Sequence, residues 1–478
     1  MSARNGLRLY SENTADHRHS LLEFPADPIA YMRRLHQQHG DFALAEDDGQ
    51  RLAFVFSPEL NRQVLCDSQL YHSQFFAVRG GRRSAQRRVT SGLLSQNGAE
   101  HRDTRRVLKD VFAKRILPGY LPTISRLSLD MANQWRTVAE VDLNSSMVEF
   151  MLRMTSTLLF GEHDSTFVLQ LGQLIDRWVR QNHHVGMGAL VSSPEFADRY
   201  DELLKMAEQL EGAVTELIDH QRIADADETN VLKLLMSVSG GGGDAAPLDL
   251  VGQTTLLFAA AHLTTAHTLS WTLLLLAQHP HVLQRLQQEM AGGISGGTPD
   301  YSELESLSYL DCVIRESMRV LPASSYSQRI TSGPAELGGV RMPAGTPVIF
   351  SQFITHHRPD LYERPDEFIP ERWFHLRPGP YEYLPFGAGP RMCIGAPLAM
   401  LELRAALCVL LREFSFQLAD DAHVDAKVVS TMLGPVSPIR ARVLAPDQLP
   451  VAVNLSGSIN ELVHFPAAGD LRGRDRAA

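Results

Sequence analysis

One feature of the sequence limits the possible folds more than any other: a long apolar segment from Leu248 to His279. Pro247 precedes it and Pro280 follows it, and prolines commonly mark the places where helices begin and end. As a helix, a segment of this length would extend about 50 Å, at a rise of about 1.5 Å per residue. Only a helix through the middle of a large domain needs such length and apolarity together. We therefore predict a mainly helical domain built around this segment.

Charge and cysteine content argue against several classes of protein. With 45 Lys and Arg against 55 Asp and Glu, the net charge is −10, so no nucleic-acid partner is expected. The N-terminus lacks the apolar core of a signal peptide, and no run of about 18 apolar residues predicts a membrane anchor. The four cysteines show no paired spacing, which favours reduced thiols and a cytoplasmic location.

The loop from Phe386 to Gly395 reads Phe-Gly-Ala-Gly-Pro-Arg-Met-Cys-Ile-Gly. It brings Cys393 to the start of a helix-forming sequence with Pro397 in its opening turn. Unpaired amides and the dipole at a helix N-terminus favour a thiolate and lower its pKa. A thiolate presented in this way suits an axial ligand of haem iron. The alternative interpretation is a buried cysteine beside a glycine turn.

All six specified positions of this loop match the pattern Phe-Gly-x-Gly-x-Arg-x-Cys-x-Gly, so the chain resembles the cytochrome P-450 family. The resemblance implies that Cys393 is the iron ligand and that the cofactor is haem b (iron protoporphyrin IX). It also implies that Arg391 reaches a haem propionate and that Phe386 packs beside the sulfur. Gly395 would let the backbone come close to the flat cofactor.

The resemblance also implies a fold. We expect the cytochrome P-450 fold, mainly α with a small β region, in which the long central helix lies over the haem. A single catalytic domain is expected at residues 1–445, followed by a partly disordered tail at 446–478. Without an N-terminal anchor, the chain is similar to the soluble, bacterial type.

The centre of the long segment, Phe258–Ala266, resembles the family's oxygen-binding pattern Ala/Gly-Gly-x-Asp/Glu-Thr-Thr/Ser. This implies that Thr264 hydrogen-bonds dioxygen and that Ala261 leaves room for a ligand on iron. Taken alone, a threonine within a helix more often bonds the carbonyl four residues earlier. Leu263 stands where the family has an acid that relays protons. Because leucine carries no proton, we expect delivery through water, through His262 or through a group on the substrate.

Two basic groups are expected at the propionates. His101 and Arg105 are four residues apart, so they share one face of a predicted helix, and such a pair suits a carboxylate. A basic surface helix is the alternative. The family places Arg329 near a propionate as well. Other basic residues of this helix are expected on a surface where an acidic electron donor docks.

A separate set of charged residues resembles a structural motif of the family. Glu316 and Arg319 are three residues apart, hence on one helical face. Together with Pro370-Glu371-Arg372-Trp373 they resemble the family's Glu-x-x-Arg helix and its Pro-Glu-Arg meander. This implies that Glu316, Arg319 and Arg372 form a buried network that supports the segment presenting Cys393. Alone, such a pair is common on protein surfaces.

Two further stretches bear on the substrate. Five arginines lie between Arg79 and Arg88, either on a solvated loop or, by position in the family, at a rim where they would steer an anionic substrate. The family places Ala323–Ser327 against the substrate, and its serines and Tyr326 suggest a pocket that can hydrogen-bond a polar group. Short strands are also expected at residues 52–56, 340–350 and 451–453.

The leading expectation is a haem-thiolate monooxygenase, which inserts one oxygen atom from O2 into a secondary metabolite or a fatty-acid-like molecule. A ferredoxin or a flavoprotein reductase would supply the electrons. A second interpretation keeps the haem but changes the reaction to peroxide-driven oxidation, coupling or desaturation, which Leu263 favours. A third is a haem sensor without turnover, against which the presence of Thr264 argues.

Overall fold

The central element of the computed structural model is helix α10, Leu250–Gln278, most of whose side chains are buried. Asp249 caps it, because its side chain accepts a hydrogen bond from the Gly252 N–H at 3.1 Å. The next helix, α11, starts at Pro280 and runs to Gly293. The long central helix expected from the sequence is therefore confirmed, within slightly narrower bounds.

The structure describes residues 8–9, 21–47, 50–74, 78–161, 165–188, 194–223, 230–239 and 249–466. The end of the expected tail, from residue 467, lies outside these ranges. Among the described residues, no helix combines the length and apolarity that a membrane crossing requires.

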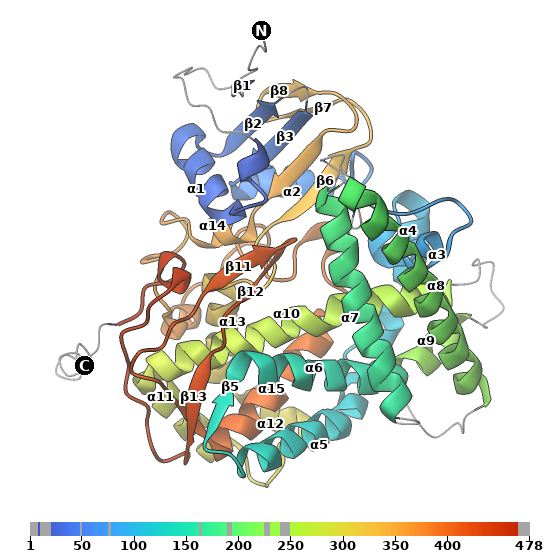
Figure 1. The fold of residues 1–478 in the computed structure, drawn as a ribbon. Helices are drawn as coiled ribbons and strands as arrows, with labels where there is room; N and C mark the ends of the chain where they lie inside the picture. Colours follow the sequence, from blue (N-terminus) through green and yellow to red (C-terminus); the bar gives the residue numbers. More distant parts are fainter. Residues whose placement is uncertain are drawn as a thin grey trace.

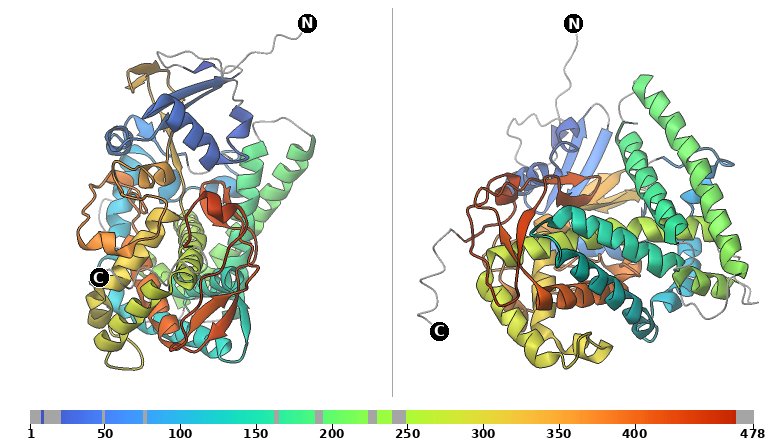
Figure 2. Two further views of the ribbon diagram at one scale, coloured as in Figure 1. Left: turned by 90° about the vertical axis from the view of Figure 1, so that its left-hand side faces the viewer. Right: turned by 60° about the horizontal axis from the view of Figure 1, so that its bottom comes forward.

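The other helices surround α10 (Figure 1). Helix α6, Leu143–Phe160, packs along it, and α15, Ala396–Glu413, packs on both α10 and α5, Leu117–Trp135. Figure 2, left, views α10 almost end-on, with other elements on every side. The remaining α-helices are α1 (Pro28–His39), α2 (Pro58–Cys66), α3 (Ala85–Val89), α4 (Gly98–Leu108), α7 (Ser165–Gly188), α8 (Pro194–Ile223), α9 (Val231–Ser239), α12 (Tyr301–Ser306), α13 (Ser308–Val320) and α14 (Gln352–His356).

The larger sheet lies at the N-terminal end of the fold, at the top of Figure 1. Its strand order is β1-β2-β3-β9-β6-β4, and only β3 and β9 are parallel within it, with Phe54 opposite Ile349. Its strands are β1 (Arg8–Leu9), β2 (Phe42–Asp47), β3 (Gln50–Val55), β4 (Tyr71–His72), β6 (Ser327–Thr331) and β9 (Pro347–Phe350). The strand expected at 52–56 is β3, one of the inner strands of this sheet.

Three smaller sheets complete the β structure: β10-β13-β5, the hairpin β11-β12 and the hairpin β7-β8. Their bounds are β5 (Glu140–Asp142), β7 (Ala335–Leu337), β8 (Val340–Met342), β10 (Ser415–Leu418), β11 (Ala426–Val429), β12 (Met432–Pro435) and β13 (Arg440–Leu444). The strand expected at 451–453 is wrong. Those backbone groups instead bond to side-chain amides, Val451 N–H to Gln417 Oε1 at 2.7 Å and Val453 N–H to Gln278 Oε1 at 3.2 Å.

Candidate active site

The loop that carries Cys393 is shaped by its own backbone and by the end of α2. A short 3₁₀ helix, η5 (Gly389–Arg391), precedes the cysteine, and the Cys393 N–H donates to the Phe386 carbonyl at 2.8 Å. Gly387 and Gly389 have φ of 65° and 70°, a left-handed conformation that glycine adopts without strain. A side chain at Gly389 would collide with the Leu65 carbonyl. The cysteine is thus held in one position just before α15, with an exposed side chain.

Opposing effects act on the pKa of the Cys393 thiol. Desolvation raises it, because protein atoms surround the sulfur closely even though the side chain is accessible. Hydrogen bonds from the Gly395 and Ala396 amides and the charge of Arg105 lower it, and the net pKa lies above the ordinary value. The amides therefore act as expected at a helix N-terminus, but the expected net lowering is wrong because desolvation outweighs them. A metal ion would reverse the balance, since a coordinating thiol is deprotonated.

Four basic side chains from separate elements gather beside this loop: His101, Arg105, Arg329 and Arg391, called here the cation cluster. Arg105 donates to the Met392 carbonyl at 2.7 Å, and Arg391 donates to Asn97 Oδ1 at 2.6 Å. Burial and then the charges of the three arginines lower the pKa of His101 to about 4. Burial and Arg391 lower the pKa of Arg329 to about 10.

Among the described residues, the cation cluster has no counter-charge from a carboxylate. Within the described part of the chain, none of its members forms a salt bridge with a carboxylate, and Nε of Arg391 is buried without a hydrogen-bond partner. Partly buried like charges are costly unless an anion pairs with them. A ligand with carboxylates, such as the two propionates of haem, supplies the missing charge through strong hydrogen bonds. The donor set and the exposed thiol therefore fit a haem.

One face of α10 remains accessible at the middle of the helix. Ala260 is exposed and Ala261, Thr264 and His267 are partly exposed, while Leu263 and most of the other side chains of this segment are buried. We call these four accessible residues the α10 stripe. The Thr264 hydroxyl donates to the Ala260 carbonyl at 2.9 Å. Its oxygen can still accept a hydrogen bond from a molecule bound over the stripe.

His262 does not belong to this stripe. It lies two residues from Thr264, about 200° around a helix with 3.6 residues per turn. Its side chain is 3% exposed, with Nε2 at 3.3 Å from the Val148 carbonyl and Nδ1 at 3.8 Å from Asp176 Oδ1. Of the proton routes expected from the sequence, the one through His262 is therefore not supported, because the imidazole points toward α6 and α7.

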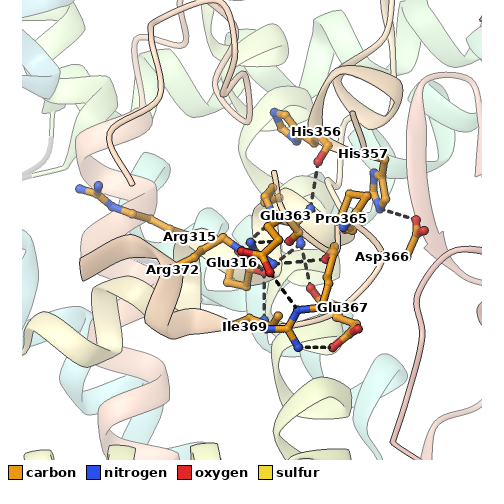
Figure 3. A network of polar contacts seen from close by, with 12 residues as sticks. Arg315, Glu316, His356, His357, Glu363, Pro365, Asp366, Glu367, Ile369 and Arg372 are labelled. Carbon is orange, nitrogen blue, oxygen red and sulfur yellow. Dashed lines mark hydrogen bonds and ion pairs between the residues drawn. The ribbon is translucent and has the colours of Figure 1, made fainter. Parts of the chain in front are cut away.

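Glu316, Arg319 and Arg372 form one buried network. Figure 3 shows this network, with Glu316 and Arg372 labelled. Arg319 binds both carboxylate oxygens of Glu316, at 2.8 and 2.9 Å, and Arg372 Nε donates to Glu316 Oε1 at 2.9 Å. Burial raises the pKa of Glu316, but the two guanidinium groups outweigh it, so this pKa lies below its ordinary value. We call these three residues and Trp373, whose indole N–H donates to Glu316 at 2.9 Å, the Glu316 network.

His356 connects this network to the cysteine loop. This connection was not predicted from the sequence. Its carbonyl accepts a hydrogen bond from Arg319 at 2.9 Å, and its Nε2 accepts one from the Leu384 N–H at 2.7 Å. Leu384 lies two residues before Phe386. Burial and Arg319 lower the pKa of His356 to about 3, so the ring is a neutral acceptor. The sequence could not predict this role, because no residue spacing identifies a histidine that bonds through its own carbonyl and one ring nitrogen.

Several side chains of the two stretches expected to contact substrate already bond to other parts of the protein. Tyr326 and Ser325 bond to the carbonyls of Ser430 and Thr431 in the turn between β11 and β12, at 2.6 and 3.0 Å. The five arginines from Arg79 to Arg88 are called here the arginine loop, although Arg87 and Arg88 lie on α3. Of these, Arg88 pairs with Glu211 of α8. The remaining exposed arginines are Arg82, Arg83 and Arg87, while Arg79 is half-buried and donates to the Ser95 carbonyl at 3.0 Å.

A mainly helical fold with a long central helix, an exposed thiol and a cluster of basic side chains beside it fits the class of haem-thiolate proteins. Residues 19–438 match the family model for cytochrome P450, so the chain belongs to that family. It is accordingly a haem-dependent oxidoreductase that uses O2, a redox partner and an organic substrate.

Relatives with known reactions lie at moderate identity. The cyclooctat-9-en-7-ol 5-monooxygenase of Streptomyces melanosporofaciens is 29% identical over 388 residues, covering 78% of this chain and 82% of the relative. Cyclooctatin synthase of the same organism is 28% identical, covering 82% and 86%. The retinoic acid-bound structure of cyanobacterial CYP120A1 has the same fold, with a TM-score of 0.76, 24% identity and coverage of 89% of this chain and 96% of that one.

Proposed function

We propose that the protein is a haem b monooxygenase that hydroxylates a largely apolar, oxygen-bearing secondary metabolite, with Cys393 as the iron ligand. The observation that carries this proposal is the exposed thiol beside four basic side chains that have no carboxylate partner in the described part of the chain. When bound, haem supplies the chemistry of dioxygen activation, and the protein supplies binding, orientation and exclusion of water. The oxygen-bearing substrate class is supported by the first relative, whose name specifies an unsaturated alcohol.

Each member of the site has a role in this proposal. Arg391, Arg329, Arg105 and His101 would hold the propionates, and Phe386 and Gly395 would border the sulfur. Thr264 would accept or donate a hydrogen bond at the oxygen-binding position, with Ala261 leaving space beside it. Leu263, buried and apolar, leaves that position without the acid that other family members use. Glu316, Arg319 and Arg372 would act structurally, by supporting the loop.

We propose that electrons come from an acidic ferredoxin or flavoprotein in the cytoplasm. Arg102, Arg106 and Lys109 are exposed on α4 and the turn that follows it. Arg105, on the same helix, bonds to the carbonyl of Met392, whose side chain is 45% exposed. A basic surface joined in this way to the cysteine loop suits an acidic donor. The four cysteines are free thiols, as in a reducing compartment.

The decisive test replaces the sulfur. In Cys393→Ser, the reduced carbonyl complex should lose the red-shifted absorption band of thiolate-ligated haem, because a serine hydroxyl is a poor iron ligand. Cys66→Ser is the matched control, since Cys66 is also an exposed thiol but lies on α2. A carbonyl spectrum that is the same in Cys393→Ser and in the unchanged protein would refute the assignment.

A second reaction is favoured by one observation: the α10 stripe holds no carboxylic acid, and Leu263 beside it is apolar. Peroxide-driven oxidation needs no acid there to protonate reduced dioxygen. Product formation with hydrogen peroxide at a rate equal to or above that with a reductase and O2 would establish this alternative. Inactivation by peroxide without product would exclude it.

A further inference from the structure

Among the polar side chains of the α10 stripe, only His267 has no role in the proposed reaction. It lies three residues after Thr264 and seven after Ala260, on the same helical face. Within the described part of the chain, neither ring nitrogen makes a hydrogen bond, and Nδ1 is buried without a partner while Nε2 is not among the buried atoms. Buried polar groups without partners are rare in proteins, so this side chain needs an explanation.

The ring is held firmly by the hairpin β11-β12. A side chain at Gly434 of β12 would collide with the imidazole, so the ring packs directly on the backbone there. One turn further along α10, the indole N–H of Trp271 donates to the Leu433 carbonyl at 3.2 Å and fixes β12 against the helix. The hairpin thus positions His267 where the accessible stripe meets the β structure.

The protonation state of His267 is set by its surroundings. Burial, then the nearby His262 and Arg180, lower its pKa to about 4, although Asp176 raises it. The ring is therefore neutral near pH 7, with a proton on one nitrogen only. Because a proton on buried Nδ1 would lose its hydrogen bond to water, the tautomer with the proton on accessible Nε2 is favoured. His267 then offers one N–H donor at a partly exposed position of the stripe.

We propose that His267 is a specificity-determining residue, whose Nε2–H binds a carbonyl, hydroxyl or ether oxygen of the substrate and thereby fixes the position of the molecule along α10. This inference rests on the proposed function, since it assigns a contact within the same site. Of the other residues of the stripe, Ala260 and Ala261 are apolar, and the Thr264 hydroxyl donates its hydrogen to the Ala260 carbonyl. His267 is then the one free donor at the end of a largely apolar stripe, and it selects an apolar molecule that carries one oxygen acceptor.

The test compares cyclododecanone with cyclododecane, two rings of similar size of which only the ketone accepts a hydrogen bond. Dissociation constants are measured from the change in the haem Soret band of the holoenzyme. In His267→Phe, we expect the constant for the ketone to rise about fivefold to tenfold and that for the alkane to change less than about twofold. His267→Gln should retain most of the ketone affinity, because its amide also donates.

Gly434→Ala provides an independent variant, because its methyl group should displace the ring while the imidazole remains. It should weaken the binding of the ketone, as His267→Phe does. The proposal would be overturned if His267→Phe lost equal affinity for the ketone and the alkane, or lost no affinity for the ketone. It would also be overturned if the ketone caused no Soret change in the unchanged protein. Failure of the proposed function would be distinguishable, since the carbonyl spectrum would then lack the thiolate band in every variant.

Discussion

The Glu316 network and the α10 stripe differ in where their polar groups find partners. In the network, Glu316 and Arg319 are fully buried and every strong bond is made within the chain. Along the stripe, the Thr264 hydroxyl bonds only to its own helix, and His267 has no hydrogen-bond partner among the described residues. Folding supplies the partners of the network, whereas we propose that a bound molecule supplies those of the stripe. Mutations should therefore act on stability in the first region and on ligand binding in the second.

The largest effect is expected in the network, from Arg319→Ala. The change leaves Glu316 buried with one of its two guanidinium partners removed and frees the carbonyls of His356, Pro365 and Glu367. Removing one partner of a buried ion pair typically costs about 3–5 kcal/mol. We expect a loss of this size in the free energy of unfolding, with reduced haem content, measured by denaturant unfolding and by absorbance.

Arg315→Ala is the control for that experiment. Arg315 lies on the same helix but is 45% exposed and pairs with Asp311 at 2.6 Å, and exposed pairs contribute about 1 kcal/mol or less. If Arg319→Ala cost no more than Arg315→Ala, folding would not depend on the network, and the contrast between the two regions would fail.

The cation cluster lies between these extremes, because folding partly buries its three arginines without a carboxylate partner among the described residues and leaves His101 neutral. In haem-free protein, His101 has a folded pKa of about 4, against an ordinary value of 6.5. Between these values the unfolded chain binds the proton and the folded chain does not, so the free energy of unfolding falls as pH falls. The full shift corresponds to roughly 3 kcal/mol, at about 1.36 kcal/mol per pKa unit.

His101→Gln should therefore reduce the loss of stability between about pH 7 and about pH 4.5 by roughly 2 kcal/mol. Burial also lowers the pKa values of His267, His279 and His356. The stability of His101→Gln should therefore still depend on pH, but less than that of the unchanged protein. Denaturant unfolding at both pH values measures the difference. His220→Gln, at an exposed position on α8, is the control. The same pH dependence in His101→Gln as in the unchanged protein would contradict the burial of a neutral His101.

The same division explains what the sequence could and could not predict. The long helix and the Glu316–Arg319 pair were predictable, because helical spacing fixes which side chains meet within one element. The links through His356 and Trp373 were not, since they depend on tertiary contacts that bring distant segments together. His262 was a reasonable proton carrier by composition, but its angle on α10 directs it to Val148 and Asp176. Resemblance marked Thr264, whereas the placement of His267 depends on a hairpin more than 150 residues later, at Gly434.

The smallest effect is expected in the arginine loop. Arg82 and Arg83 are exposed and form no ion pair among the described residues, in contrast to Arg88, which is paired with Glu211. Exposed charges act on an anionic ligand through long-range attraction, which salt screens over about 10 Å at 0.1 M ionic strength.

Replacing Arg82 and Arg83 together by Ala should weaken dodecanoate binding about twofold to threefold at low salt and leave dodecanol binding unchanged. The difference should vanish at high salt, because the charges are then screened. Soret titrations of both ligands at two salt concentrations measure it, with Arg102 and Arg106 replaced by Ala as a control on exposed α4. Equal dodecanoate affinity in all three proteins at low salt would show that this loop is only a solvated surface. A loss of dodecanoate affinity that does not depend on salt would instead place one of the two arginines in direct contact with the ligand. The ligand-binding region would then extend from α10 to the arginine loop.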